Sequence, residues 1–329
     1  MPVHVRTRIG LGLLLAAAAC PPAFASDFML FKLTNVLIYA IALLGLNIQV
    51  GYNGQISLGH GAFYAIGAYV AAIMVAGFDV PHWIAVPLAG ILCLGAGFAF
   101  GLPILHLDGM RFAMATFAMG AVLPIVVKHD SLERWTGGTQ GMSLDQPAVP
   151  LGLPISFDQW LYFFTLAVLV AALAASANLL RGRIGRALIA IRDHPVAAQA
   201  SGIDTTWFKA AAFGVSAMFA GIAGALATLA LQYIAPTLFG IFLSFGFLIG
   251  IAVGGLASLS GALYGAIFMQ AIFLVVGVVA TTLPTGPTFL IYGVALILVV
   301  HFMPGGLASV VQRWLSPAPA EPSVPKPLR

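Results

Sequence analysis

The sequence has very little charge. Only 7% of its 329 residues are Asp, Glu, Lys or Arg, whereas 61% are hydrophobic, and the mean hydropathy is +1.03. A soluble domain carries about 25% charged residues, so the 14 basic and 10 acidic side chains here are too few to cover a surface that faces water. The composition therefore excludes a soluble enzyme, a nucleic-acid-binding protein and a disordered chain, and it indicates a multi-span membrane protein.

Cysteine and nucleotide-binding motifs are also scarce or missing. Cys20 and Cys93 both lie in apolar runs, so they provide neither a disulfide framework nor a metal cluster. The sequence has no G-x-x-x-x-G-K-[ST] phosphate-binding loop, and none of its lysines follows a glycine. We therefore expect no catalytic residue, no metal site and no cofactor on this chain, and ATP that drives it would bind to another chain.

The predicted spans lack acidic and basic residues near their middles. Ion-driven transporters usually need such a residue as the coupling element, so its absence argues against an ion-coupled transporter without excluding an uncharged sodium site. Ser57 and His60 lie three residues apart at a predicted helix start, which is a chance-level arrangement and not a protease motif. Isolated polar residues are interpreted as hydrogen-bonding groups between helices; they are Asn47, Gln49, Gln232 and Gln270.

Apolar runs long enough to cross a bilayer recur along the chain. About 20 residues are needed for a helical span, and the runs lack the alternation of barrel strands. We therefore predict an all-α fold, a polytopic membrane protein with about 9–10 transmembrane helices. The predicted spans are Ile9–Ala25, Leu33–Val50, Ile56–Gly77, Trp83–Leu105, Phe112–Val127, Trp160–Leu180, Ala210–Ile234, Leu238–Ala257, Leu259–Leu283 and Thr288–Met303.

Basic residues concentrate in one connection, 181–209. It holds Arg181, Arg183, Arg186, Arg192 and Lys209 but only two acidic residues. Because Lys and Arg favour the cytoplasmic side of a membrane protein, we expect this connection in the cytoplasm. Alternation of the spans then places the C-terminus inside, the N-terminus inside if the first segment is uncleaved, and the connection 128–159 outside.

The two ends of the chain differ from the rest. Residues 1–25 combine Arg6 and Arg8 with an apolar stretch and small residues before Ser26, so they are either a cleaved signal peptide or an uncleaved first transmembrane helix. Residues 316–329 contain five prolines and are expected to form a disordered tail. The membrane domain is therefore expected at residues 26–315.

Glycine, by contrast, is abundant, with 37 residues. It recurs at four-residue spacing, as in Gly246, Gly250 and Gly254 or in Gly97 and Gly101. Small residues at this spacing let helix backbones approach closely in a bilayer, and the spacing predicts a compact bundle. The alternative is that such thin helix faces permit the rocking that alternating access requires.

Three segments match one known family. Residues 51–63 read Gly-Tyr-Asn-Gly-Gln-Ile-Ser-Leu-Gly-His-Gly-Ala-Phe, residues 185–193 read Gly-Arg-Ala-Leu-Ile-Ala-Ile-Arg-Asp, and residues 254–262 read Gly-Gly-Leu-Ala-Ser-Leu-Ser-Gly-Ala. With Met-Pro-Gly-Gly-Leu at 303–307, they span nearly the whole chain in the family's order. The sequence thus resembles the LivM-type permease subunits of branched-chain amino-acid ABC transporters, which are binding-protein-dependent permeases of the bacterial inner membrane.

The resemblance implies a complex. The permease domain, residues 26–315, would pair with a second, LivH-like permease subunit, two cytoplasmic ABC ATPase subunits and a periplasmic substrate-binding protein, in a lipid bilayer and without nucleic acid. It would import branched-chain or related amino acids, and ATP hydrolysis would take place on the separate subunits, so this chain is not expected to be an enzyme. The alternatives are a urea or short-amide permease, an ion-coupled secondary transporter acting alone and a passive channel.

The connection 181–209 is then the expected ATPase-coupling loop. We expect one or two short amphipathic helices whose small residues fit a groove on an ATPase. The alternative is that its basic residues serve only as a positive-inside anchor. The candidate coupling residues are Gly185, Arg186, Arg192, Asp193, Ala197, Ala198, Gly202, Ile203 and Lys209.

The glycine-rich segment 51–61 is the expected gate of the pathway. Because glycine costs helix stability, we interpret the segment as a re-entrant or broken element, which a membrane tolerates only where protein or water covers it. A plain turn between two helices is the alternative. The candidate pathway and gate residues are Gly51, Asn53, Gly54, Gln55, Ser57, Gly59, His60, Gly61, Phe63, Gly254 and Gly255.

Overall fold

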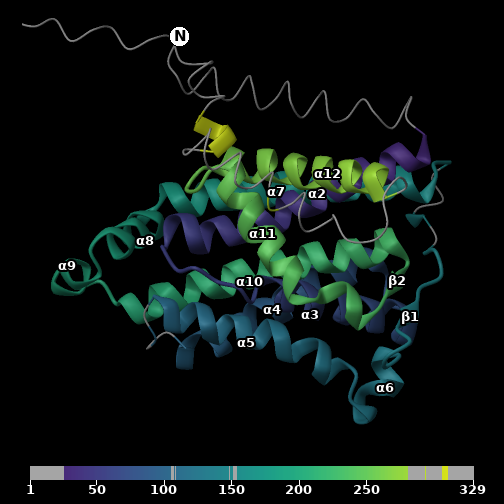
Figure 1. Cartoon of the computed structure of the whole chain (residues 1–329), viewed down its shortest axis with the longest axis horizontal. Helices are drawn as coiled ribbons and strands as arrows, with labels where there is room; N and C mark the ends of the chain where they lie inside the picture. Colours follow the sequence, from purple (N-terminus) through teal and green to yellow (C-terminus); the bar gives the residue numbers. More distant parts are fainter. Residues whose placement is uncertain are drawn as a thin grey trace, which may run out of the picture.

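The computed structural model describes residues 26–104, 107, 109–147, 149–150, 154–280, 293 and 306–309, and these are almost entirely helical (Figure 1). The helices are α2 (Asp27–Asn47), continued by a π-helical turn (Ile48–Tyr52); α3 (His60–Ala72), continued by a second π-helical turn (Ile73–Gly77); α4 (His82–Ile104); α5 (Met110–Val127); α6 (Asp130–Thr136); α7 (Phe157–Arg181); α8 (Arg183–Asp193); α9 (Pro195–Ala200); α10 (Thr205–Leu231); a 3₁₀ turn (Pro236–Phe239); α11 (Ile241–Gly254); and α12 (Leu259–Ala280).

The all-α membrane fold predicted from the composition is confirmed. Among the described residues, six helices are long and apolar enough to cross a membrane, namely Asp27–Tyr52, His60–Gly77, His82–Ile104, Met110–Val127, Phe157–Arg181 and Thr205–Leu231. Two shorter apolar helices, Ile241–Gly254 and Leu259–Val275, accompany them. The predicted first span Ile9–Ala25, the last span Thr288–Met303 and the tail 316–329 lie outside the described residues.

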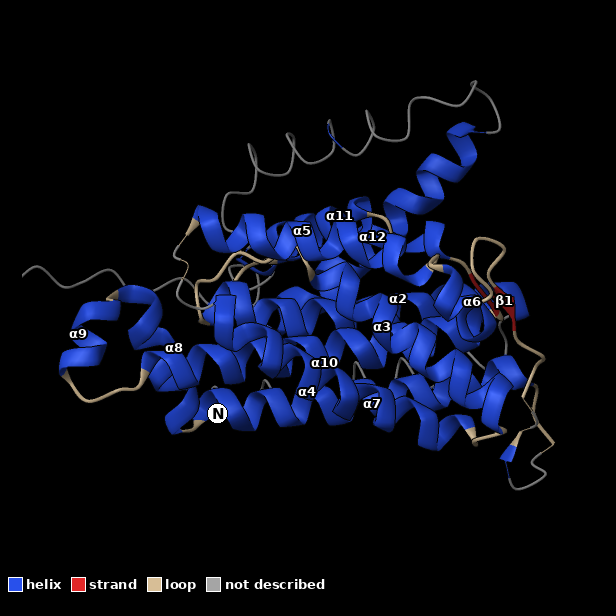
Figure 2. Ribbon diagram, turned by 90° about the horizontal axis from the view of Figure 1, so that it is seen from below, coloured by secondary structure: helices blue, strands red, loops and turns tan. Residues whose placement is uncertain are grey.

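The long helices form one bundle around α10. This helix packs along α2, α3 and α4, and α2 in turn packs against α7, α11 and α12. The short helices α8 and α9 project at one end of the bundle, which we call the α9 end (Figures 1 and 2). At the opposite end, called the α6 end, β1 (Met142–Ser143) pairs antiparallel with β2 (Tyr233–Ile234), close to α6.

Small residues let the central helices pack closely, as predicted. A Cβ atom on Gly67 of α3 would collide with the backbone of Gly221 in α10. A Cβ atom on Gly97 of α4 would likewise collide with the side chain of Ala217, one turn earlier in α10. Close backbone approach replaces hydrophobic burial as a source of contact in a bilayer, so these glycines fix the spacing of the core.

Two helices are shorter than the spans that the sequence predicted for them. The span expected at 56–77 begins only at His60, because residues 53–59 are not helical. The span expected at 238–257 is also wrong as a full crossing. Its helix, α11, has 14 residues and is therefore about 21 Å long, which is shorter than the hydrocarbon core of about 30 Å.

The two interrupted helices begin inside the bundle and meet there. His60, the first residue of α3, bonds to the Ala42 carbonyl in the interior of α2, about 15 Å along the helix from Tyr52. The backbone N–H of Gly61 donates to the Ser244 hydroxyl in the first turn of α11 at 2.9 Å. Neither helix has a side-chain cap, and Gly59 and Gly240 occupy the two N-cap positions.

Candidate functional site

The elbow formed by α8 and α9 confirms the two short helices expected in the connection 181–209. α8 is amphipathic, since Leu188 and Ile191 are buried whereas Arg183 and Arg186 are exposed. Its buried side faces α7 and α10. α9 starts with Pro195 in its first turn, a position that tolerates the missing N–H of proline. The exposed basic face and the α9 tip therefore extend away from the bundle.

The predicted coupling residues divide into a base and a tip. Gly185 is at the base, and a Cβ there would collide with the Leu180 carbonyl at the sharp bend from α7. At the tip, Ala198 is buried, but Ala197 and Gly202 are exposed. Gly202 has φ +81 with open space around it. Ile203 and Lys209 are half-buried where the chain re-enters the bundle.

Arg192 connects the elbow to the predicted gate. Its Nη1 donates to the Gly51 carbonyl at 2.8 Å, while its Nε lies 2.9 Å from Asp193 Oδ1. Gly54 has φ +74, and a Cβ there would lie 2.7 Å from Arg192 Cγ. The Arg192 side chain thus lies against both the π-helical turn that follows α2 and the start of the non-helical segment, so two sets of residues that were predicted separately form one site.

The segment 53–59 is held by its own polar groups and by α5. Asn53 Nδ2 donates to Gln55 Oε1 at 2.8 Å, and the Gly59 N–H donates to the Ser57 hydroxyl at 3.4 Å. The Leu58 N–H donates to Thr116 Oγ1 of α5 at 3.0 Å. The segment is therefore a non-helical break that leads from Tyr52 to buried His60; Ser57 and Gly59 are buried in it, whereas Gly54 and Ile56 are exposed.

Glycines bring α5 and α11 against the gate segment. A Cβ on Gly59 would lie 2.7 Å from the Thr116 carbonyl, and a Cβ on Gly61 would lie 2.7 Å from Ser244 Oγ. A Cβ on Gly120, one turn after Thr116, would lie 3.3 Å from the Leu58 carbonyl. Side chains at these positions would push α5 and α11 away, so the glycines fix the closed packing of this region.

His60 and Phe63 lie in the core and not along an open passage. His60 Nε2 is 2.9 Å from the Ala42 carbonyl, and its Nδ1 is 3.4 Å from Ser216 Oγ of α10. The Phe63 ring meets Phe213 edge to face at 5.4 Å. Both residues tie α3 to neighbouring helices. The Ser57 hydroxyl accepts from the Gly59 N–H.

The turn between α11 and α12 completes the α9 end. Asn47 Oδ1 accepts from the Ala257 N–H at 2.9 Å, and its Nδ2 donates to the Ser258 carbonyl at 2.6 Å. This confirms the prediction that Asn47 is a hydrogen bonder between helices. Gly255, at φ +119, provides the left-handed backbone of the turn. A Cβ on Gly254 would collide with the Gly261 carbonyl, so the turn is tightly closed.

Gly51 lies at the centre of these contacts. A Cβ on it would collide with Asn47 Oδ1 and with the Ala257 backbone, while its carbonyl accepts from Arg192. The π-helical turn Ile48–Tyr52 is thus held between the elbow on one side and the α11–α12 turn on the other. Such turns concentrate at functional sites, and this one joins all three segments on which the resemblance rests.

Sequence reasoning missed two residues of the site. Thr116 and Ser244 hold the non-helical segment and the start of α3, but each is a single small polar residue within an apolar run. A polar residue inside a predicted apolar span was the only signal in the sequence that could have pointed to either residue. Among the described residues, no group of three His, Cys, Asp or Glu side chains is arranged to hold a metal ion.

Comparison with known proteins places the sequence in a family. Residues 28–302 match the family model described as "Branched-chain amino acid transport system / permease component". The chain is 32% identical over 289 residues to the high-affinity branched-chain amino acid transport system permease protein LivM of Salmonella typhimurium, covering 80% of this chain and 67% of that protein. LivM of Escherichia coli K12 gives the same identity and coverage.

The similarity to the other permease type is weaker. LivH of Escherichia coli K12 is 23% identical over 253 residues, covering 70% of this chain and 79% of that protein. No solved structure matches the chain significantly. The family model covers most of the chain, and the motifs at 51–63, 185–193 and 254–262 occupy the contacts described above. The chain therefore belongs to the family of permease components of branched-chain amino-acid transport systems, and it is of the LivM type.

Proposed function

We propose that this chain is the transmembrane permease subunit of an ATP-driven importer for branched-chain or related amino acids. The observation that carries the proposal is the contact of Arg192 with Gly51 and Gly54, which joins the elbow to the interrupted helix. A chain without a nucleotide site needs a surface that receives force from another protein. The elbow provides that surface, and the Arg192 contact provides a route into the bundle.

The proposed orientation of the chain in the membrane is supported by the charge of the elbow. The basic residues of the elbow favour the cytoplasm, so the α9 end faces the cytoplasm and the α6 end faces the periplasm of a bacterial inner membrane. Exposed Arg186 and the exposed tip at Ala197 and Gly202 then lie where a cytoplasmic ATPase subunit can bind.

The mechanism begins at the tip of the elbow. When the ATPase subunits close, they push α9, and α8 turns on its buried contacts with α7 and α10. Arg192 transmits this movement to Gly51 and the segment 53–59, whose inner end rests on Thr116 and Ser244. The segment is held by a few hydrogen bonds and close glycine contacts, so a shift of about 1 Å loosens the packing of α5 and α11.

The chemistry around the gate suits an amino acid with an apolar side chain. The surrounding helices present exposed apolar residues, including Phe117 on α5 and Phe245 on α11, whose rings lie 6.4 Å apart. A few hydroxyl and amide groups supply the polar contacts for a zwitterionic head group. Urea or a short amide is the second candidate substrate, because the same small polar groups suit it.

The proposed complex contains a second, LivH-like permease subunit, two cytoplasmic ABC ATPase subunits and a periplasmic substrate-binding protein. ATP is hydrolysed on the ATPase subunits, and this chain contributes no catalytic residue. The support is the family membership, the separate similarity to LivM and LivH, and the basic elbow.

The proposal is tested by charge reversal at the elbow. In membranes that contain all the subunits, Gly202→Glu and Arg192→Glu should abolish copurification of the ATPase subunits, while the chain still inserts into the membrane. Unchanged association for both variants would remove the coupling role. Uptake by the purified chain alone, driven by an ion gradient, would instead establish the secondary transporter and overturn the proposal.

A further inference from the structure

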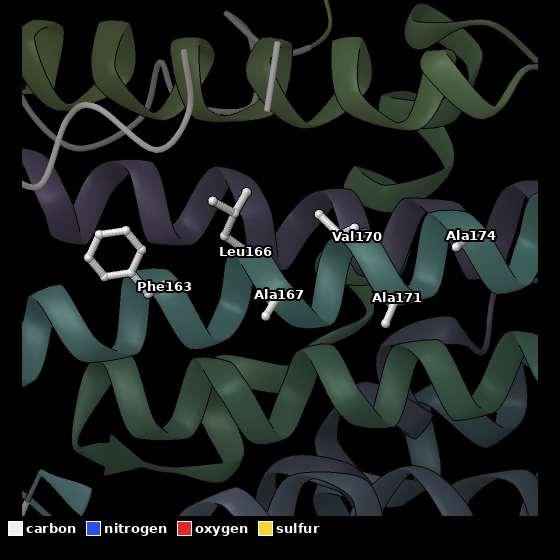
Figure 3. A pocket seen from close by; sticks show the side chains of 6 residues that line it. All are labelled: Phe163, Leu166, Ala167, Val170, Ala171 and Ala174. Atoms are coloured by element: carbon white, nitrogen blue, oxygen red, sulfur yellow. The ribbon is translucent and has the colours of Figure 1, made fainter. Parts of the chain in front are cut away.

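One face of α7 carries an apolar groove that nothing covers within the described part of the chain. The groove runs along the helix and is lined by six apolar residues, of which Leu166 is buried and the other five are exposed (Figure 3). The opposite face of α7 packs on α2. The lining residues are Phe163, Leu166, Ala167, Val170, Ala171 and Ala174.

The small residues in the groove suit the packing of another helix against α7. Ala167 and Ala171 line it four residues apart, and the exposed Ala175, just beyond the lining, continues the row. A surface that only faces lipid gains nothing from small side chains, whereas a neighbouring helix gains contact area when its backbone approaches closely. Phe163 closes the groove near the α6 end of the helix (Figure 3).

We propose that the groove seats the N-terminal segment of this chain, residues 9–20, as an uncleaved N-terminal helix. The segment carries a matching stripe, since Gly12, Ala16 and Cys20 also recur at four-residue spacing. Pro21 and Pro22 follow directly and end the helix. Two stripes of small residues then face each other on antiparallel helices.

The start of α2 puts the segment within reach of the groove. Ser26 and Asp27 begin α2 at the α6 end, and Asp27 lies within electrostatic range of Asp158 in the first turn of α7. The five residues 21–25 span up to about 17 Å when extended. Packed helix axes are about 8–10 Å apart, so a helix that ends at Cys20 can lie beside α7.

Length and charge agree with this placement. A helix of residues 9–20 is about 18 Å long, and the groove from Phe163 to Ala174 covers about 17 Å of α7. Arg6 and Arg8 precede the helix and would lie at the α9 end, the basic side of the molecule. That is the side on which a membrane protein retains Lys and Arg.

The other apolar segment outside the described residues is directed elsewhere. The predicted last span, Thr288–Met303, follows α12 and precedes Gly306. A Cβ on Gly306 would lie 2.7 Å from Gly255 Cα, at the turn where α12 begins. Gly306, which follows this span, therefore lies at the α11–α12 turn and not at α7.

Two measurements on the full chain test the proposal. The mass of the purified protein should include residues 1–25, whereas a mature N-terminus at Ser26 would overturn the proposal. Native Cys20 should form a disulfide with Phe163→Cys or Ala167→Cys on mild oxidation, because a disulfide needs Cα atoms less than about 7 Å apart. The crosslinked peptide is identified by mass spectrometry.

Matched controls make the crosslink specific. Val122→Cys is equally exposed to lipid on α5, near the same end of the bundle, and should give no disulfide with Cys20. Cys20→Ala should abolish the α7 crosslink, and buried Cys93 stays unchanged in every variant. An uncleaved chain without an α7 crosslink would show that lipid fills the groove, which also overturns the proposal. Neither measurement depends on transport, so failure here is distinguishable from failure of the proposed function.

Discussion

The contact of Arg192 with Gly51 predicts partial uncoupling when the guanidinium is removed. Arg192→Gln keeps a polar side chain of similar length but loses the charged donor to the Gly51 carbonyl. The variant should still assemble with the ATPase subunits, because glutamine removes the positive charge without introducing the negative charge of Arg192→Glu. It should, however, transmit less of their movement.

The size of the effect can be worked out from the contact. A hydrogen bond that involves a charged group contributes about 1.5–3 kcal/mol. The Arg192 side chain is 33% exposed, so solvent screening reduces this value. We expect a coupling loss of about 1 kcal/mol, which corresponds to roughly a fivefold change in an equilibrium.

The assay is the number of amino-acid molecules imported per ATP hydrolysed, measured with the complete transporter in liposomes. Arg192→Gln should lower this ratio while ATP hydrolysis persists. Arg192→Lys should give a ratio between those of Arg192→Gln and the unaltered chain, because a lysine head group cannot contact Gly51 and Asp193 in the same way. Arg183→Gln removes the same charge from the same helix at an exposed position and should have no effect. Equal ratios for Arg192→Gln and Arg183→Gln would refute the reasoning.

Packing contacts elsewhere in the bundle lead to further predictions. Gly67→Ala overpacks the crossing of α3 and α10 and should cost about 1–3 kcal/mol of stability, seen as a lower unfolding temperature in detergent; Gly95→Ala, which has open space, should not lower it. Asn47→Ala leaves two backbone groups of the α11–α12 turn unpaired and should cost about 1–3 kcal/mol, whereas Asn35→Ala removes only a bond within α2 and should cost less. Ser201→Glu at the exposed tip should weaken ATPase binding in a pull-down, and Ser201→Lys should not; the reverse order would contradict a basic docking surface.

The helices were predictable because their signal is averaged over many residues. Runs such as 157–181 and 205–231 each contain a long window of high mean hydropathy, so one or two polar positions do not change the assignment. Elbow helices α8 and α9 were predictable for a similar reason, because the spacing of Leu188 and Ile191 among basic residues is amphipathic. The Pro at the start of α9 marks the break between them.

The interruptions were only partly predictable. Five glycines at 51–67 indicated a broken element, but composition does not show that residues 53–59 turn inward until the Leu58 contact with Thr116 is known. The short α11 was missed because residues 238–257 are apolar apart from Ser244, and their composition does not show that a 3₁₀ turn and the extended backbone of Gly240 precede the helix. The contact of Arg192 with Gly51 joins residues 141 positions apart, and no local pattern encodes such a pairing.

The central claim is that the α8–α9 elbow lies in the cytoplasm and receives the ATPase subunits. It is tested most directly by labelling Ala197→Cys, an exposed position on α9, with a membrane-impermeant maleimide in a chain that carries Cys20→Ser. The account predicts labelling in inside-out vesicles, no labelling in intact cells, and protection when the ATPase subunits are added. Labelling from outside intact cells would contradict it.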